Sequence, residues 1–250
     1  MKTMIKNLAL SLLASMTALV LAAHVRAYDA TDKYETRTLD GWTVRINQQL
    51  LKDHPALASD TLRLLDFQLY QITRVVPPRS LEALQVVPIW IEFAHPLNPC
   101  MCYHPSADWL REHDMNPAKA RCVEISNVTN FLAWTKEQPW MVLHELAHSF
   151  HDRVLGFHNS EVKAAYDRAV ASKSYDNVLR INGATGRHYA MTNDQEYFAE
   201  CSEAFFGTND FFPFTRAELK QHDPDMYKLL TLLWGVESPT QATRASPVAQ

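Results

Sequence analysis

The strongest chemical signal in the chain is a pair of histidines separated by three residues. The segment reads His144-Glu145-Leu146-Ala147-His148. On a helix, residues four positions apart lie on one face, so both imidazoles can reach one metal ion while Glu145 stands beside it. The spacing therefore predicts a zinc site with His144 and His148 as ligands and Glu145 as a general base. The alternative is a pair of helix-face histidines that bind no metal.

A catalytic zinc ion needs a third protein ligand and leaves its fourth position to water. His151 shares the face of the histidine pair, but a third ligand from the same helix fits tetrahedral geometry poorly. We therefore expect His151 to contact the ligands from outside or to face solvent. His151 and Val154 also stand where the extended H-E-x-x-H-x-x-G-x-x-H pattern requires its glycine and its last histidine, which excludes a metzincin site.

Three glutamates further along the chain offer the missing ligand. Glu196, Glu200 and Glu203 lie at positions i, i+4 and i+7 of a predicted helix. Like charges at such spacing destabilise a helix by ~0.2–0.5 kcal/mol per pair, and a bound cation would reverse that effect. The alternative is an acidic helix face exposed to solvent.

A second motif follows the histidine pair and reads Tyr189-Ala-Met-Thr-Asn-Asp-Gln-Glu196-Tyr-Phe-Ala-Glu200. Together the two motifs resemble the catalytic domain shared by anthrax lethal factor and the Pro-Pro endopeptidases, which are zinc metallopeptidases of the gluzincin type. The resemblance covers approximately residues 139–206. It implies an α+β, zincin-like fold with a small twisted sheet, an H-E-x-x-H active-site helix and a helical C-terminal part.

The resemblance also implies a role for each matching residue. It implies one zinc ion per chain and three ligands, His144, His148 and Glu196. Glu145 is then the general base, Tyr189 presents its hydroxyl to the developing oxyanion, and Glu200 orients a ligating histidine. Glu203 is expected outside the metal set. His188 is the rival of Tyr189, although we expect it in a solvent-exposed loop.

The elements that position these residues can be predicted from hydrophobic spacing and turn residues. Upstream of the histidine pair we expect a strand near residues 39–46 with a turn at Asp40-Gly41, and then a helix over 57–72 that ends at Pro77-Pro78. An edge or bulged strand over 85–93, which contains Pro88, should follow. After it we expect a long surface excursion over 94–120 with a short helix near Trp109, and a strand over 122–128. The last of these is our candidate edge strand for pairing with an extended peptide.

The second half of the chain is predicted to be mainly helical. We expect helices from Pro139 to Gly156, over 161–172, over 193–206 and near 216–221 and 224–234, with a loop over 182–186. The predicted organisation is a signal peptide over 1–27, a flexible leader over 28–37, one zinc metallopeptidase domain over 38–236 and a disordered tail over 237–250.

Composition excludes several classes of protein. With 250 residues, 47% of them hydrophobic, the chain can bury a core, so we exclude a disordered or fibrous main state. The formal net charge of −4 gives no support to a nucleic-acid partner. The apolar run from Leu8 to Ala23 follows Lys2 and Lys6, which is typical of a cleaved signal and predicts export to the periplasm or the exterior, with no stable membrane insertion afterwards.

Export also sets an expectation for the cysteines. Four are present: Cys100, Cys102, Cys122 and Cys201. An oxidising compartment favours one or two disulfides, and the pairing stays open among three possibilities.

The sequence thus predicts an exported zinc-dependent endopeptidase whose partner is a peptide or protein substrate. The alternatives are a zinc-stabilised secreted binding protein without turnover, an exopeptidase or amidase that uses the same zinc site, and a structural secreted protein. The oligomeric state stays open.

Overall fold

The computed structural model describes residues 28–95 and 98–236, and in this part of the chain five strands form one mixed sheet. The strands are β1 (Tyr34–Leu39), β2 (Trp42–Asn47), β3 (Ile89–Ile91), β4 (Met101–Tyr103) and β5 (Val123–Ile125). Their order in the sheet is β1-β2-β3-β5-β4. The pairs β2–β3 and β3–β5 are parallel, whereas β1–β2 and β5–β4 are antiparallel. The chain is therefore an α+β protein, as the sequence predicts.

The first two strands form a hairpin that corrects one expectation. The predicted turn is confirmed, with positive φ values of 43° at Asp40 and 93° at Gly41. The flexible leader over 28–37 is wrong, because Tyr34–Leu39 pairs with β2 along its whole length. Tyr34 is buried and packs edge-on against Trp90, with 4.7 Å between the ring centroids. This contact holds the polar segment Tyr34–Leu39 against the sheet.

The two faces of the sheet differ in what they bury. One face carries aliphatic side chains that join the main hydrophobic core beneath the helices: Val44, Ile46, Ile89, Ile91, Val123 and Ile125. The opposite face carries Arg45, Trp90 and Glu124, and Arg45 lies over the Trp90 ring at 4.7 Å from its centroid. One face is thus an apolar layer, and the other holds buried charge.

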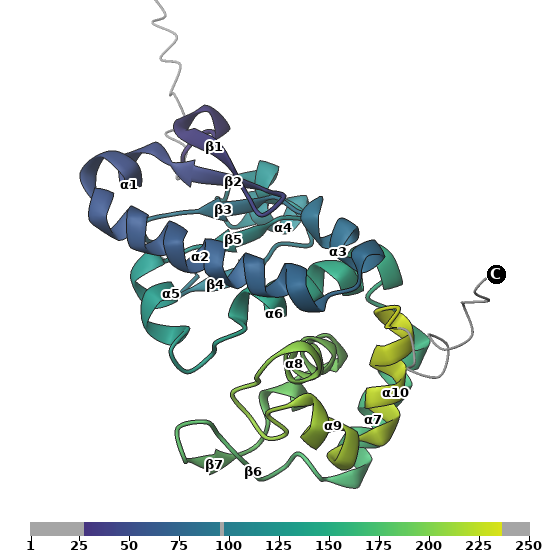
Figure 1. Ribbon diagram of the computed structural model, residues 1–250. Helices are drawn as coiled ribbons and strands as arrows, with labels where there is room; N and C mark the ends of the chain where they lie inside the picture. Colours follow the sequence, from purple (N-terminus) through teal and green to yellow (C-terminus); the bar gives the residue numbers. More distant parts are fainter. Residues whose placement is uncertain (1–27, 96–97, 237–250) are drawn as a thin grey trace, which may run out of the picture.

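Helices before the histidine pair cover the apolar face: α1 (Gln48–Asp53), α2 (Pro55–Val75), α3 (Pro78–Gln85) and α5 (Val128–Trp134). The short helix α4 (Ala107–Glu112) lies on the opposite face, where Trp109 stacks on His104 with 6.4 Å between the ring centroids. Figure 1 shows the long helix α2 lying across the sheet. The predicted helix over 57–72 and the short helix near Trp109 are both confirmed.

Three expectations for the sheet are corrected. Pro88 immediately precedes β3, so its missing N–H lies outside the ladder and β3 occupies an interior position. The strand predicted over 122–128 is β5, and it also lies inside the sheet, between β3 and β4. The edge strand beside it is β4, which belongs to the segment that we expected to be irregular. The candidate edge for peptide pairing is therefore β4.

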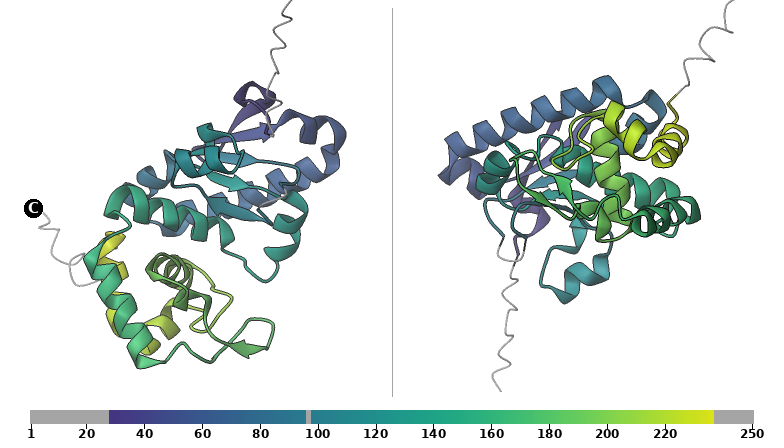
Figure 2. Two further views of the ribbon diagram at one scale, coloured as in Figure 1. Left: turned by 180° about the vertical axis from the view of Figure 1, so that it is seen from behind. Right: turned by 90° about the horizontal axis from the view of Figure 1, so that it is seen from below.

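The second half of the described chain is mainly helical. Its elements are α6 (Met141–Phe150), α7 (Ser160–Ser172), β6 (Val178–Leu179), β7 (Thr185–Gly186), α8 (Asp194–Phe206), α9 (Arg216–His222) and α10 (Pro224–Leu233). A π-helical turn over His151–Leu155 extends α6, and Gly156 ends it with a φ of 80°. In Figures 1 and 2, α7 to α10 form a layer on one side of α6, and the sheet lies on its other side.

All four cysteines lie in the described residues, and each is a free thiol: Cys100, Cys102, Cys122 and Cys201. The expected disulfides are therefore wrong. The sulfurs have separate surroundings, because Cys100 Sγ contacts Met141 Sδ at 3.5 Å, whereas Cys122 Sγ approaches the carbonyl oxygen of Ala120 at 3.5 Å.

Two predicted segments, the signal peptide over 1–27 and the tail over 237–250, lie outside the described residues. Across residues 28–95 and 98–236, the model contains no helix with both the length and the apolar character required to cross a bilayer.

Candidate metal centre

The histidine pair lies on α6, as predicted. Every residue of α6 is buried except Glu145, which is half-buried. Leu143, Leu146 and Phe150 join the main core and fix the helix beneath the sheet. Since the rest of the helix is enclosed, Glu145 is its one partly exposed side chain, and it lines a cavity of about 460 Å³.

Helix α8 brings a carboxylate to the same cavity. Its first turn is fixed by Asn193, whose side-chain oxygen accepts the N–H of Glu196 at 2.8 Å. This cap confirms the predicted start of the helix. Helices α6 and α8 pack against each other. As a result Glu196, 52 positions after His144, reaches its ring.

The three predicted ligands converge on one point. His144 Nε2 and His148 Nε2 lie 3.1 Å apart. Glu196 Oε2 lies 3.1 Å from the first nitrogen and 3.3 Å from the second. Two donors bound at ~2.0–2.1 Å to a tetrahedral zinc ion are about 3.3–3.4 Å apart, so the triangle of donor atoms fits such an ion. The donor set of two imidazoles and one carboxylate also suits zinc.

The local charges favour an ionised carboxylate in this triangle. Burial alone would raise the pKa of Glu196, but hydrogen bonds and charge from His144 and His148 lower it below its usual value. Burial would likewise lower the pKa of His144, but its contacts with Glu196 and Glu203 raise it. The site thus concentrates negative charge around the two imidazoles, which is the environment that a cation requires.

The carboxylate that lies within hydrogen-bond distance of His144 Nδ1 is that of Glu203, whereas the resemblance implies Glu200 at this place. Glu203 Oε1 lies 2.7 Å from His144 Nδ1, whereas Glu200 Oε1 lies at 3.6 Å, beyond hydrogen-bond distance. The reason is helical geometry: position i+7 returns to the face of Glu196 more closely than position i+4 does. Glu200 and Glu203 are both buried, and burial raises the pKa of each.

Two further predicted residues border the same cavity. Tyr189 begins a short 3₁₀ helix, Tyr189–Met191, and is 48% exposed. Burial of its ring and the charge of Glu196 raise the pKa of Tyr189, so the hydroxyl keeps its proton at neutral pH. Glu145 Oε2 accepts the backbone N–H of Tyr103 in β4 at 2.8 Å. The edge strand therefore holds the carboxylate that the sequence assigns as a base.

Two histidines lie elsewhere than expected. His151 is fully buried beside Phe157 and Phe198, and burial lowers its pKa to about 4. Neither of its ring nitrogens has a hydrogen-bond partner within the described chain, and the ring does not face solvent. His188 is buried rather than exposed, and its Nδ1 accepts the N–H of Ala190 at 3.1 Å. Neither ring lines the cavity.

A second space of about 500 Å³ lies next to this cavity. Both are bordered by Trp134, Gln138 and Arg180. On the other side the first cavity is bordered by residues 100–103, which include the edge strand β4. An elongated ligand therefore has room to extend from the edge strand, past the converging donors, to Arg180.

A comparison with protein families gives one match. Residues 117–233 match the family described as anthrax toxin lethal factor, N- and C-terminal domain. No curated protein and no solved structure shows significant similarity to the chain. The match supports a relationship to lethal factor. It includes α6 and α8 but begins after β4, and because the family spans domains from both ends of the toxin it does not by itself identify a catalytic domain.

Proposed function

We propose that the protein is a zinc-dependent endopeptidase of zincin-like architecture. One observation carries this proposal: three donor atoms, from His144, His148 and Glu196, lie within 3.3 Å of one another beside the half-buried carboxylate of Glu145. A protein that only binds zinc has no need of a carboxylate next to the ligands. The relationship to lethal factor supports the same reading.

The reaction can be derived from the residues that border the cavity. A Zn²⁺ ion bound there would supply Lewis acidity, which activates water for attack and polarises a carbonyl group. Because Oε2 of Glu145 is held by the Tyr103 N–H, Oε1 is left to accept the proton of the attacking water and to deliver it to the leaving amine. The protonated hydroxyl of Tyr189 donates to the oxygen on which negative charge develops.

The edge strand offers a way to align a peptide. In β4, Cys102 faces Glu124 across the ladder, so the main-chain groups of Met101 and Tyr103 point away from β5. The hydrogen bond from Tyr103 N–H to Glu145 agrees with this direction. An extended substrate that pairs with Met101 would pass directly over α6 and bring one peptide bond to the donor triangle.

An exported location and a peptide or protein substrate belong to this proposal. The location rests on the predicted signal over residues 1–27, and the substrate class rests on the edge strand and the open length of the cavity. The negative net charge gives no reason to add a nucleic-acid partner.

The decisive experiment is digestion of a peptide library whose members are acetylated at the N-terminus and amidated at the C-terminus. Mass spectrometry should detect internal cleavage that stops on chelation and returns with zinc. Cleavage of peptides with free ends alone would identify an exopeptidase instead. No cleavage by fully zinc-loaded protein, against either library, would leave a binding protein as the better description.

A further inference from the structure

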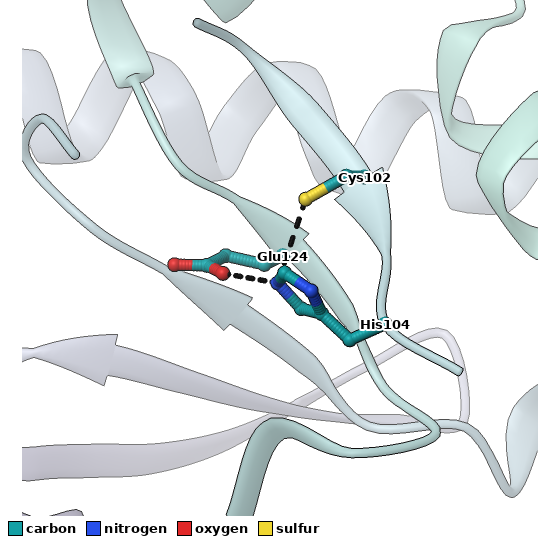
Figure 3. Close-up of side chains that lie close together, drawn as sticks. All are labelled: Cys102, His104 and Glu124. Carbon is teal, nitrogen blue, oxygen red and sulfur yellow. Dashed lines mark hydrogen bonds and ion pairs between the residues drawn. The ribbon is translucent and has the colours of Figure 1, made fainter. Parts of the chain in front are cut away.

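A second group of side chains of the types that ligate metals lies at the edge of the sheet, outside the cluster on α6 and α8. Figure 3 shows Cys102, His104 and Glu124 pointing toward one another. His104 Nε2 lies 3.4 Å from Cys102 Sγ and 2.5 Å from Glu124 Oε2. His104 and Glu124 are almost completely enclosed, with 4% and 0% exposure.

The backbone explains why these three meet. Cys102 and His104 are two positions apart along an extended segment, so both point to the same face of the sheet. Glu124 is the direct cross-strand partner of Cys102 in the β4–β5 ladder. That face is the one with buried charge, opposite the apolar layer over α6. Strand pairing alone therefore brings the sulfur, the nitrogen and the oxygen to one point.

We propose that Cys102, His104 and Glu124 bind a second zinc ion. A thiolate, an imidazole and a carboxylate are all established zinc ligands, and the presence of sulfur disfavours magnesium and calcium. The fourth position would be left to water. This site is independent of the proposed catalytic function.

Without an ion, hydrogen bonds connect these side chains to one another and to Ser126, whose Oγ lies 3.7 Å from Cys102 Sγ. Nε2 of His104 carries at most one proton, yet it faces both Cys102 Sγ and Glu124 Oε2. If Nε2 donates to the carboxylate, it cannot also accept from the thiol, and Cys102 Sγ then has Ser126 Oγ as its hydrogen-bond partner. To ligate one zinc ion, Nε2 and Oε2 would have to separate from 2.5 Å to about 3.3 Å, so the ion would replace the hydrogen bond between them.

The surrounding charges permit such an ion. Lys119 Nζ is shared between Glu92 Oε1 at 2.5 Å and Glu124 Oε1 at 2.7 Å. Glu92 thus balances Lys119, and the second oxygen of Glu124 stays directed at His104. With Cys102 deprotonated, three negative side chains balance one ammonium group and a divalent ion, and the thiol proton leaves to solvent. A buried cluster of zero net charge avoids the cost of an isolated charge.

The site also lies partly outside the segment that matches lethal factor. The match begins at residue 117, whereas Cys102 and His104 precede it. The proposed second site therefore does not rest on the match to lethal factor. An ion bound there would link β4 to β5 next to Tyr103, whose N–H contacts Glu145, and would stabilise the position of the edge strand.

Metal content of the purified, zinc-loaded protein provides the first test. We expect two zinc ions per chain, falling to one in Cys102→Ser and in His104→Ala. Glu196→Ala should also fall to one, but through loss of the other ion. Cys122→Ser is the matched control, because Cys122 is buried nearby but is not one of the three ligands; it should keep both.

Cobalt provides a readout that separates the two sites. The donors on α6 and α8 include no sulfur, so only the site at Cys102 can give a near-ultraviolet thiolate-to-cobalt charge-transfer band. We expect the band in Co²⁺-loaded wild-type protein and in Glu196→Ala, and its loss in Cys102→Ser.

Wild-type protein that binds one zinc ion and shows no thiolate band would overturn the proposal, even if the enzyme cleaves peptides. This measurement needs no variant, so misfolding of Cys102→Ser cannot obscure the answer. A band that persists in Cys102→Ser but disappears in Cys122→Ser or Cys201→Ser would equally exclude Cys102 as a ligand. Conversely, a band without peptide cleavage would support the second site and remove the proposed function.

Discussion

Glu203 Oε1 accepts a hydrogen bond from His144 Nδ1 at 2.7 Å across 59 positions of sequence. A carboxylate at this place fixes the tautomer of the imidazole, because the proton resides on Nδ1 and the lone pair of Nε2 is left to face a metal ion. His148 has no such partner, since its buried Nδ1 makes no hydrogen bond within the described residues. The two histidines are therefore oriented by different means.

The first prediction concerns this carboxylate. Replacing Glu203 with Ala should weaken zinc binding at the α6–α8 site by roughly 10–100-fold, because His144 loses the group that orients it. Competition with a chelator of known affinity measures the change. Glu200→Ala is the matched control from the same buried stripe and should weaken binding less, since its oxygen lies 3.6 Å from Nδ1. An equal or larger effect at Glu200 would contradict the assignment.

The second prediction concerns the proposed base. Glu145→Gln should keep its zinc and lower kcat by at least ~10²–10⁴, because an amide cannot accept the proton of the attacking water. Metal analysis and peptide turnover on the same sample measure both quantities. Glu82→Gln, a substitution of an exposed glutamate on α3, should leave turnover unchanged. Turnover in Glu145→Gln near the wild-type rate would remove this residue from the mechanism.

The third prediction concerns Tyr189. Tyr189→Phe should retain zinc and reduce kcat by ~10²–10³ with little change in KM, because the lost hydroxyl acts on charge that develops only in the transition state. Steady-state kinetics measures the split between the two constants. Tyr70→Phe, which alters an exposed tyrosine on α2, is the control. A rise in KM at constant kcat would instead assign Tyr189 to substrate binding.

The fourth prediction concerns the packing of α8 against the start of α6. A Cβ atom added at Gly207 would lie 2.0 Å from Cε2 of Trp140. Gly207→Ala should therefore destabilise the protein by ~1–3 kcal/mol, as overpacked cores do. Urea unfolding measures the change. Gly186→Ala meets no atom within 4 Å and should have a small effect. Equal stability of the two variants would mean that Trp140 moves aside at little cost.

The elements with strong local signals were predictable from the sequence. The helix over 57–72 has regular apolar spacing and a double proline after it, and α8 begins at a residue that caps it through its own side chain. The spacing of His144 and His148 likewise made their common helix face predictable. In each case the deciding interactions lie within a few residues of sequence.

The expectations that differ from the structure concern elements whose conformation depends on contacts with residues far away in the sequence. Strand β4 has only three residues, and nothing within the strand distinguishes it from a loop until β5 pairs with it. The leader became a strand because Tyr34 is buried against Trp90. The choice between Glu200 and Glu203 depended on how α8 is rotated against α6, which tertiary packing decides. The i+7 spacing of Glu203 from Glu196 is the sequence signal that could have indicated Glu203.

The edge strand β4 presents different chemistry on its two sides. The N–H of Tyr103 holds Glu145 on one side, while Cys102 meets His104 and Glu124 on the other. A slip of one residue against β5 would exchange the two sets of groups and disable both at once. Insertions or deletions between β3 and β4 that alter this register should therefore be far more harmful than changes of equal length in the β6–β7 hairpin.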